Sequence, residues 1–320
     1  MEKALVLGAT GGTGTVIITE LLKRGIETVA FGRSMGKLER LSQQLGNPPG
    51  LELRTGDVFK ADDIYTASQG ADVIIHSASV PYHEMTTKLL PMGEAVMEAA
   101  NRLAARVVAV DGIYPYGRRT GEQPIDEDYP KRPHTRKGQT KLAFEHMFFS
   151  PRWSRTSGMI VRLPDYYGPT ANEASYLGST LAAIAAGKPG MFIGNMTIPR
   201  EYVYLPDAAR MIVELACREE AYGQNWNIPG PGVISGKEIV RLARAASGKS
   251  RPVIPVGAAG LRLLGLFVPV MKEIVEMLYL TEEPLRLSGS KYERLIGPIP
   301  ATPFAQGIAE TIRALQEKER

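Results

Sequence analysis

Two lysines and a group of polar residues at a predicted strand end offer most of the chemistry in this sequence. Lys137 and Lys141 stand four positions apart in a segment expected to be helical, which places both side chains on one helix face. A lysine near a second cation can have a lowered pKa, so Lys137 is a candidate proton donor. Asp111 and Tyr116 lie at or just past the end of a predicted strand, where α/β sheets place ligands. Asp111 is a candidate base or a partner for either lysine, and Tyr116 a candidate acid. The alternative for both lysines is an exposed, solvated helix face.

A glycine-rich turn is the second chemical feature. The sequence GATGGTG follows the apolar run Ala4–Leu7 and precedes Val16–Leu22, whose apolar residues recur at helical spacing. This order predicts a strand, a tight turn and a helix N-terminus, where backbone N–H groups can bind a diphosphate. The candidate dinucleotide-binding residues are Gly8, Thr10, Gly11, Gly12, Thr13 and Gly14. The alternative is a tight turn without a ligand.

The end of the second predicted strand, Thr28–Phe31, indicates which dinucleotide would bind. An acidic residue here would hydrogen-bond the adenosine ribose of NAD, but the chain continues Gly32-Arg33-Ser34 without a carboxylate. A guanidinium can bind a 2′-phosphate through two hydrogen bonds. Arg33 therefore favours NADP over NAD. The alternative is that Arg33 is an ordinary surface residue.

Strand and helix patterns alternate through the first half of the chain and predict a doubly wound parallel α/β sheet of the Rossmann type. The predicted strands after the first are Thr28–Phe31, Leu51–Leu53, Asp72–Ile75, Arg106–Val110 and Gly158–Leu163. We expect a dinucleotide-binding domain over residues 1–168, with later segments returning to the sheet. Residues 169–320 are expected to form mainly a smaller substrate lobe with C-terminal helices.

Composition excludes several classes of function. The net charge of +4 comes without a basic run, which argues against nucleic acid as a partner. The four histidines are scattered and lack the spacing of metal ligands, so no metal is expected. The first strand begins at once, which leaves no signal peptide, and the single cysteine fits a reducing compartment, so we expect a cytoplasmic protein. The apolar stretch Val253–Leu280 is interrupted by charges and a proline, and we expect a helix pair or a peripheral apolar face, without integral membrane association.

Several motifs, in order, resemble those of the extended short-chain dehydrogenase/reductase family, which includes NAD(P)-dependent epimerases and dehydratases. After the glycine turn come GDV at Gly56–Val58, IIHSAS at Ile74–Ser79, DGIYPYG at Asp111–Gly117 and RLPDYYGP at Arg162–Pro169. The stretch REYVYLPDAA at Arg200–Ala209 also has a family counterpart. The resemblance therefore extends over nearly the whole chain.

The resemblance implies specific cofactor contacts. Asp57 corresponds to the aspartate that binds the adenine amino group, Ser77 and Ala78 to small residues beneath the cofactor ribose, and Lys141 to the lysine that binds the nicotinamide ribose. Further implied contacts come from Ser34, Val58 and Pro164. The alternative for Asp57 is a helix N-cap, and for Ser77 and Ala78 it is close packing.

The chain departs from the family at the proton-transfer groups. The family places a tyrosine four residues before the lysine, but Lys137 occupies that position here. Asp111 and Gly112 stand where a serine or threonine is usual. This pattern resembles the atypical branch, which keeps the fold and changes or loses the active site.

Three functions fit these features. The leading one is an NADP(H)-binding oxidoreductase-like protein, a candidate reductase of a small carbonyl substrate. The second is a non-catalytic NADP(H) redox sensor, and the third is a nucleotide-sugar epimerase or dehydratase with relocated catalytic groups. A small-molecule substrate is the expected partner, and a homodimer is a candidate assembly.

Overall fold

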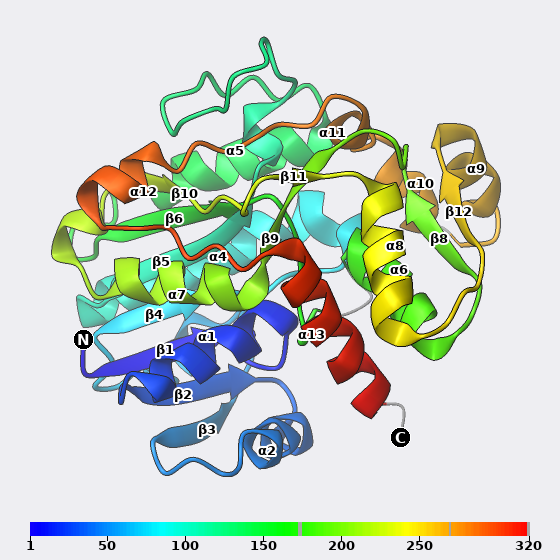
Figure 1. The fold of residues 1–320 in the computed structure, drawn as a ribbon. Coiled ribbons are helices and arrows are strands. Elements are labelled where there is room, and N and C mark those ends of the chain that lie inside the picture. Colours follow the sequence, from blue (N-terminus) through cyan, green and yellow to red (C-terminus); the bar gives the residue numbers. More distant parts are fainter. Residues whose placement is uncertain (172–174, 269, 319–320) are drawn as a thin grey trace. The chain divides into compact units, whose positions relative to one another are not determined.

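The computed structural model describes residues 1–171, 175–268 and 270–318. Within them the largest sheet has seven strands in the order β10-β6-β5-β4-β1-β2-β3 (Figure 1). The strands are β1 (Lys3–Leu7), β2 (Glu27–Gly32), β3 (Leu51–Thr55), β4 (Val73–His76), β5 (Arg106–Gly112), β6 (Gly158–Leu163) and β10 (Asn225–Asn227). β1 pairs in parallel with both β2 and β4, so the strand order reverses beside β1. The predicted doubly wound sheet is confirmed.

Helices connect these strands. They are α1 (Gly12–Lys23), α2 (Met35–Gln44), α3 (Ala61–Ala67), α4 (Met85–Leu103) and α5 (Arg136–Phe148), with short 3₁₀ turns at Tyr82–Glu84 and Tyr114–Tyr116. Parallel strands require such crossover connections, because the chain must return to the same end of the sheet each time.

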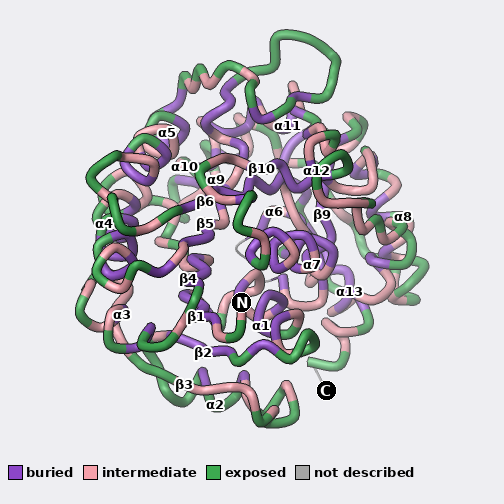
Figure 2. Tube along the Cα trace, turned by 90° about the vertical axis from the view of Figure 1, so that its left-hand side faces the viewer, coloured by how far each residue is buried: buried purple, intermediate pink, exposed green. Residues whose placement is uncertain are grey.

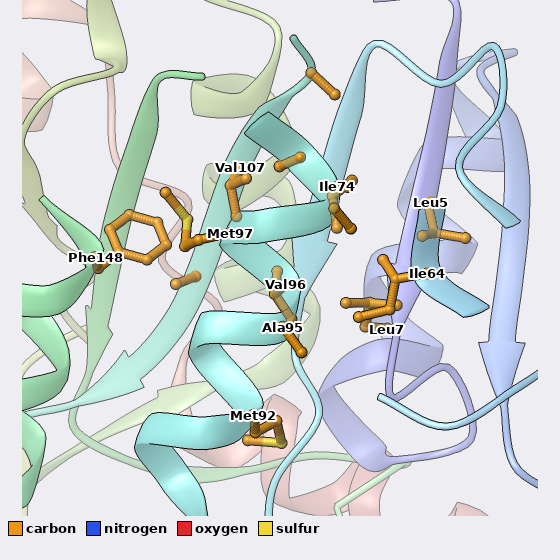
Figure 3. Packing of buried hydrophobic residues seen from close by; sticks show 14 of the residues in the cluster. Leu5, Leu7, Ile64, Ile74, Met92, Ala95, Val96, Met97, Val107 and Phe148 are labelled. Atoms are coloured by element: carbon orange, nitrogen blue, oxygen red, sulfur yellow. The ribbon is translucent and has the colours of Figure 1, made fainter. Parts of the chain in front are cut away.

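The central strands are buried on both faces. Leu5 and Leu7 pack on one face with residues of α3 and α4 (Figure 3), while Ala4 and Val6 point to the other face and are also fully buried. Figure 2 shows the same pattern as continuous buried stretches along these strands. A strand covered on both faces needs apolar residues at consecutive positions, which explains the short apolar runs in the sequence.

The chain separates into two compact units. The first unit contains residues 1–115, 136–162 and 209–226, and the second contains residues 116–135, 163–208 and 227–320. The glycine turn, both candidate lysines and Asp111 all belong to the first unit.

The second unit contains two small sheets among the described residues, in the orders β11-β9-β7 and β12-β8. Their strands are β7 (Asp165–Tyr167), β8 (Gly190–Ile193), β9 (Arg200–Tyr204), β11 (Val233–Ile234) and β12 (Val253–Val256). The helices of the second unit are α6 (Tyr176–Ala186), α8 (Gly236–Ser247), α9 (Ala258–Leu264), α10 (Val270–Val275), α11 (Tyr279–Glu282), α12 (Ser290–Leu295) and α13 (Phe304–Lys318). α7 (Leu205–Ala216) begins in the second unit and continues into the first, which also contains the 3₁₀ turn at Glu219–Ala221. Ser235 caps α8, because its Oγ accepts a hydrogen bond from the Glu238 amide at 3.2 Å.

The apolar stretch Val253–Leu280 forms a strand before it forms helices. Its first residues make β12, which pairs in parallel with β8, and α9 and α10 follow. No helix in the described part of the chain is long and apolar enough to span a bilayer.

Candidate functional site

The candidate site lies along one edge of the large sheet, where parallel strands end. Leu7 of β1 is level with Phe31 of β2 and with His76 of β4, so the turns after these three strands start at the same edge. Gly8 and Arg33 are two of the predicted cofactor residues in those turns. Residues far apart in the sequence are therefore brought together by the parallel register.

The glycine turn is packed too tightly for side chains at two positions. Gly8 has φ +80°, and a Cβ there would lie 2.6 Å from the backbone N and Cα of Ala78. A Cβ on Gly14 would lie 2.3 Å from the carbonyl oxygen of Gly8. Thr10 is exposed, and Gly11 is a half-exposed N-cap residue of α1 without a side-chain hydrogen bond. The turn thus presents backbone and a helix N-terminus to solvent, which suits a diphosphate.

The remaining candidate contacts for adenosine lie in the neighbouring turns. Ser77 Oγ donates to the Leu7 carbonyl at 2.8 Å, so this hydroxyl joins β4 to β1. Asp57 Oδ1 accepts from the amide of Phe59 at 3.0 Å, while Lys60 is the N-cap residue of α3. Asp57 therefore stabilises the turn that leads to α3 rather than the helix end itself.

Arg33 and Ser34 are exposed after β2, and Ser34 is the N-cap residue of α2. Lys37 is exposed one turn into the same helix. No carboxylate occurs between Phe31 and Ser34. Arg33 and Lys37 therefore place two exposed cations after this strand, and these would attract a phosphate.

A network of buried charges surrounds Lys141. Its Nζ donates to Asp111 Oδ1, and Asp111 Oδ2 accepts from Arg162 Nη1 at 2.9 Å. Arg162 Nη2 in turn donates to Glu145 Oε2 at 2.5 Å, and Glu145 Oε1 accepts from Asn225 Nδ2 at 2.7 Å. Two cations and two anions alternate along this network, which compensates the cost of burying each charge.

The charges of the network set the ionisation of Asp111, which belongs to it, and of the nearby His76. Burial alone raises the pKa of Asp111, but the charges of Lys141 and Arg162 outweigh burial and hold that pKa below its usual range. Burial, followed by the charge of Lys141, lowers the pKa of His76 to about 4. At neutral pH the site therefore holds a carboxylate at Asp111 and a neutral imidazole at His76.

Lys137 is buried, with only 1% of its surface exposed. Its Nζ lies 4.6 Å from the centroid of the Tyr82 ring, and the Tyr82 hydroxyl lies 3.4 Å from that of Tyr114. Lys137 and Lys141 both point inward from α5, while Gln139 between them is exposed. The alternative of a solvated helix face does not fit Lys137.

A model of the NAD dependent epimerase/dehydratase family matches residues 4–228. The chain belongs to this family. A UDP-glucuronic acid 4-epimerase from Bacillus cereus, solved with NAD, has the same fold, with a TM-score of 0.80 and 19% identity over 99% of this chain and 100% of that one. A dTDP-glucose 4,6-dehydratase from Bacillus anthracis, also solved with NAD, gives a TM-score of 0.81 and 14% identity over 100% and 98% of the two chains.

A dehydrogenase and a reductase match shorter parts of the chain. A 3-beta-hydroxysteroid dehydrogenase of Mycolicibacterium neoaurum is 33% identical over 80 residues, which is 25% of this chain and 20% of that enzyme. A very-long-chain 3-oxoacyl-CoA reductase of Mus musculus is 42% identical over 65 residues, or 20% of this chain and 21% of that enzyme. The chain thus matches about one fifth of the length of either relative.

Two of the residues predicted for the site, Tyr116 and Pro164, lie in the second unit. The Tyr116 hydroxyl is buried and donates to Asn227 Oδ1 at 2.8 Å, and Asn227 Nδ2 donates to the Ile125 carbonyl at 3.0 Å. Pro164 precedes β7 in the same unit. The glycine turn, Arg33 and both lysines belong to the first unit.

Arg162 and Glu145 belong to the charge network but were not among the residues predicted for the site. One signal was present: Arg162 is the only charged residue in the otherwise apolar strand sequence GMIVRL of β6. A charge within a fully buried strand requires an oppositely charged partner nearby. The histidine that ends the apolar strand β4, His76, is a similar signal.

Proposed function

We propose that this chain binds NADP(H) at the glycine turn and reduces a small carbonyl compound. The observation that carries the proposal is the burial of Lys137 four residues before Lys141, at the position where the family places its tyrosine. A buried ammonium at this position replaces one proton donor by another, so proton transfer to a substrate oxygen remains chemically available.

The fit of the cofactor rests on the backbone of the turn and on local charge. The close approach of Gly8 to Ala78 and of Gly14 to Gly8 leaves no room for side chains at these two positions, which lets backbone N–H groups reach a diphosphate. Arg33 supplies the cation for a 2′-phosphate. Asp57 and Lys141 are the proposed contacts for the adenine and for the nicotinamide ribose. When bound, NADPH supplies the hydride.

The two lysines have separate proposed roles. Lys141 has three N–H donors, of which Asp111 accepts one, so the ammonium can also hold ribose hydroxyls. Asp111, itself fixed by Arg162, orients Lys141. Lys137 lies beside Tyr82 and donates the proton to the substrate oxygen.

The test is NADPH oxidation against ketones, enones, quinones and sugar nucleotides. With an active substrate, Lys137→Met is expected to lower kcat roughly 100-fold or more, because general acid catalysis contributes about that factor. NADPH affinity should stay within about twofold, since Lys137 is not a proposed cofactor contact.

The exposed Gln139 on the same helix provides the matched control, and Gln139→Met is expected to keep full activity. Unchanged kcat in Lys137→Met would refute Lys137 as the proton donor.

A second candidate function is a redox sensor that binds NADP(H) without turnover. The observation that favours it is the loss of both usual proton-transfer groups, with Lys137 and Asp111 in their places. Tight NADPH binding with no turnover on any substrate of the panel would support the sensor. Turnover with a sugar nucleotide alone would support a nucleotide-sugar enzyme.

A further inference from the structure

The second unit exposes an apolar turn at the end of α9. Its side chains are Leu263, Leu266, Phe267 and Val268, which are 63%, 66%, 82% and 45% exposed. We call these four residues the apolar turn. Scattered exposed apolar residues are common, but here four of six consecutive positions are exposed and apolar, with an aromatic ring at the most exposed one.

The apolar turn is ordered. The amides of Leu266, Phe267 and Val268 donate to carbonyl groups in the last turn of α9 at 3.1, 3.0 and 2.9 Å. Leu261, earlier in α9, is fully buried and anchors the helix. Because these amides are already bonded, the turn can enter an apolar environment without leaving their donors unsatisfied.

The sequence that leads up to the apolar turn is basic. No acidic residue occurs between Glu238 and Glu273, whereas six basic residues do: Arg241, Arg244, Lys249, Arg251, Arg262 and Lys272. Arg251, Arg262 and Lys272 are exposed, and the last two flank the turn directly. The segment therefore combines exposed apolar side chains with charge that complements an anionic surface.

The neighbouring small sheet adds apolar surface. Met191 of β8 pairs with Ile254 of β12, so both side chains point to the same face, and they are 42% and 60% exposed. β12 leads into α9, and α9 contacts both β12 and α10 (Figure 1).

We propose that the apolar turn is a peripheral membrane anchor that inserts into the surface of an anionic phospholipid bilayer. Its most exposed side chains insert while Arg262 and Lys272 contact lipid phosphates. Such binding is interfacial and needs no spanning helix. A bilayer is favoured over a protein partner because the nearest charges on either side of the turn in the sequence, Arg262 and Lys272, are both basic and exposed; the half-exposed Glu273 follows Lys272.

The test is flotation of the purified full chain with vesicles of phosphatidylcholine alone or mixed with phosphatidylglycerol. We expect binding to the mixed vesicles that weakens as salt is raised. The double variant Leu266→Ser/Phe267→Ser and the double variant Arg262→Glu/Lys272→Glu should each lower the bound fraction at least about tenfold.

Matched controls change exposed residues elsewhere. Leu295→Ser, at the end of α12, and Arg119→Glu should leave vesicle binding unchanged. Phe267→Trp should show a blue-shifted emission when mixed vesicles are added, which reports insertion of this position directly.

Two results would overturn the proposal. One is absence of flotation with the mixed vesicles, including the case where the chain self-associates through the turn in sedimentation experiments and ignores lipid. The other is binding that persists in Leu266→Ser/Phe267→Ser. Neither result bears on NADPH oxidation, so the proposed function is tested separately.

Discussion

At the scale of single residues, Arg33 decides the proposed choice between the two dinucleotides. Arg33→Asp removes a charge-assisted contact and adds a repulsion, so NADPH affinity is expected to fall by roughly 1–3 kcal/mol while NADH affinity changes little. Calorimetric titration with each cofactor measures this. Arg40→Asp, an exposed cation further along α2, is the control and should change neither affinity. Equal or tighter binding of NADH by the unmodified chain would refute the NADP assignment.

His76 makes stability depend on pH. Its pKa is about 4 in the folded state against 6.5 in the unfolded chain, so the unfolded state binds the proton first as pH falls. The contribution of neutral His76 to the free energy of unfolding is therefore fully present above pH 6.5. It is lost as the pH falls from 6.5 to 4, and the total loss is about 3 kcal/mol.

The measurement is the free energy of unfolding of the unmodified chain and of His76→Gln from pH 8 to 4. The difference between the two should shrink as pH falls. His146→Gln changes an exposed imidazole on α5 and should leave the profile parallel to that of the unmodified chain. A constant difference for His76→Gln would contradict the assigned cause.

At the scale of elements, close backbone contacts hold the segment that consists of β1, the glycine turn and α1. Gly8→Ala and Gly25→Ala both place a side chain at positive φ, +80° and +73°, so both incur a similar backbone penalty of about 1 kcal/mol. Only Gly8 has a neighbour in the way, since nothing lies within 4 Å of a Cβ at Gly25.

Gly8→Ala is therefore expected to cost roughly 1–3 kcal/mol more than Gly25→Ala in urea unfolding. It should also abolish NADPH binding, whereas Gly25→Ala should retain it. Equal costs would show that the turn relaxes away from Ala78, and would contradict the close packing inferred for Gly8.

At the scale of the whole molecule, the proposed cofactor contacts are concentrated in the first unit. NADPH should therefore slow amide hydrogen exchange over Gly8–Gly14 and around Arg33, Asp57 and Ala78, because a ligand that binds only the folded state suppresses opening of the segments it touches. Exchange in α8 and α13 of the second unit should change least. Protection spread evenly over both units would contradict this localisation.

The sequence by itself determined the features that depend on neighbouring residues. The apolar run Ala4–Leu7, the glycine spacing and the helix that follows predict β1, the turn and α1, because turn geometry and helix starts are local properties. The cap of α8 is also a local feature, because Ser235 and Glu238 stand three positions apart in the sequence. The order of motifs also predicted the family, and the alternating pattern predicted the doubly wound sheet.

Only the tertiary structure decided which charges meet. Asp111 lies 30 residues from Lys141 and 51 from Arg162 in the sequence, and no local pattern selects these partners over Lys137. Burial of Lys137 likewise depends on what packs over α5, including Tyr82. Electrostatic partners in a folded chain are set by strand order and register, which arise from long-range packing. The sequence could therefore name Asp111 as a partner for either lysine, but it could not choose between the lysines or add Arg162 and Glu145 to the network.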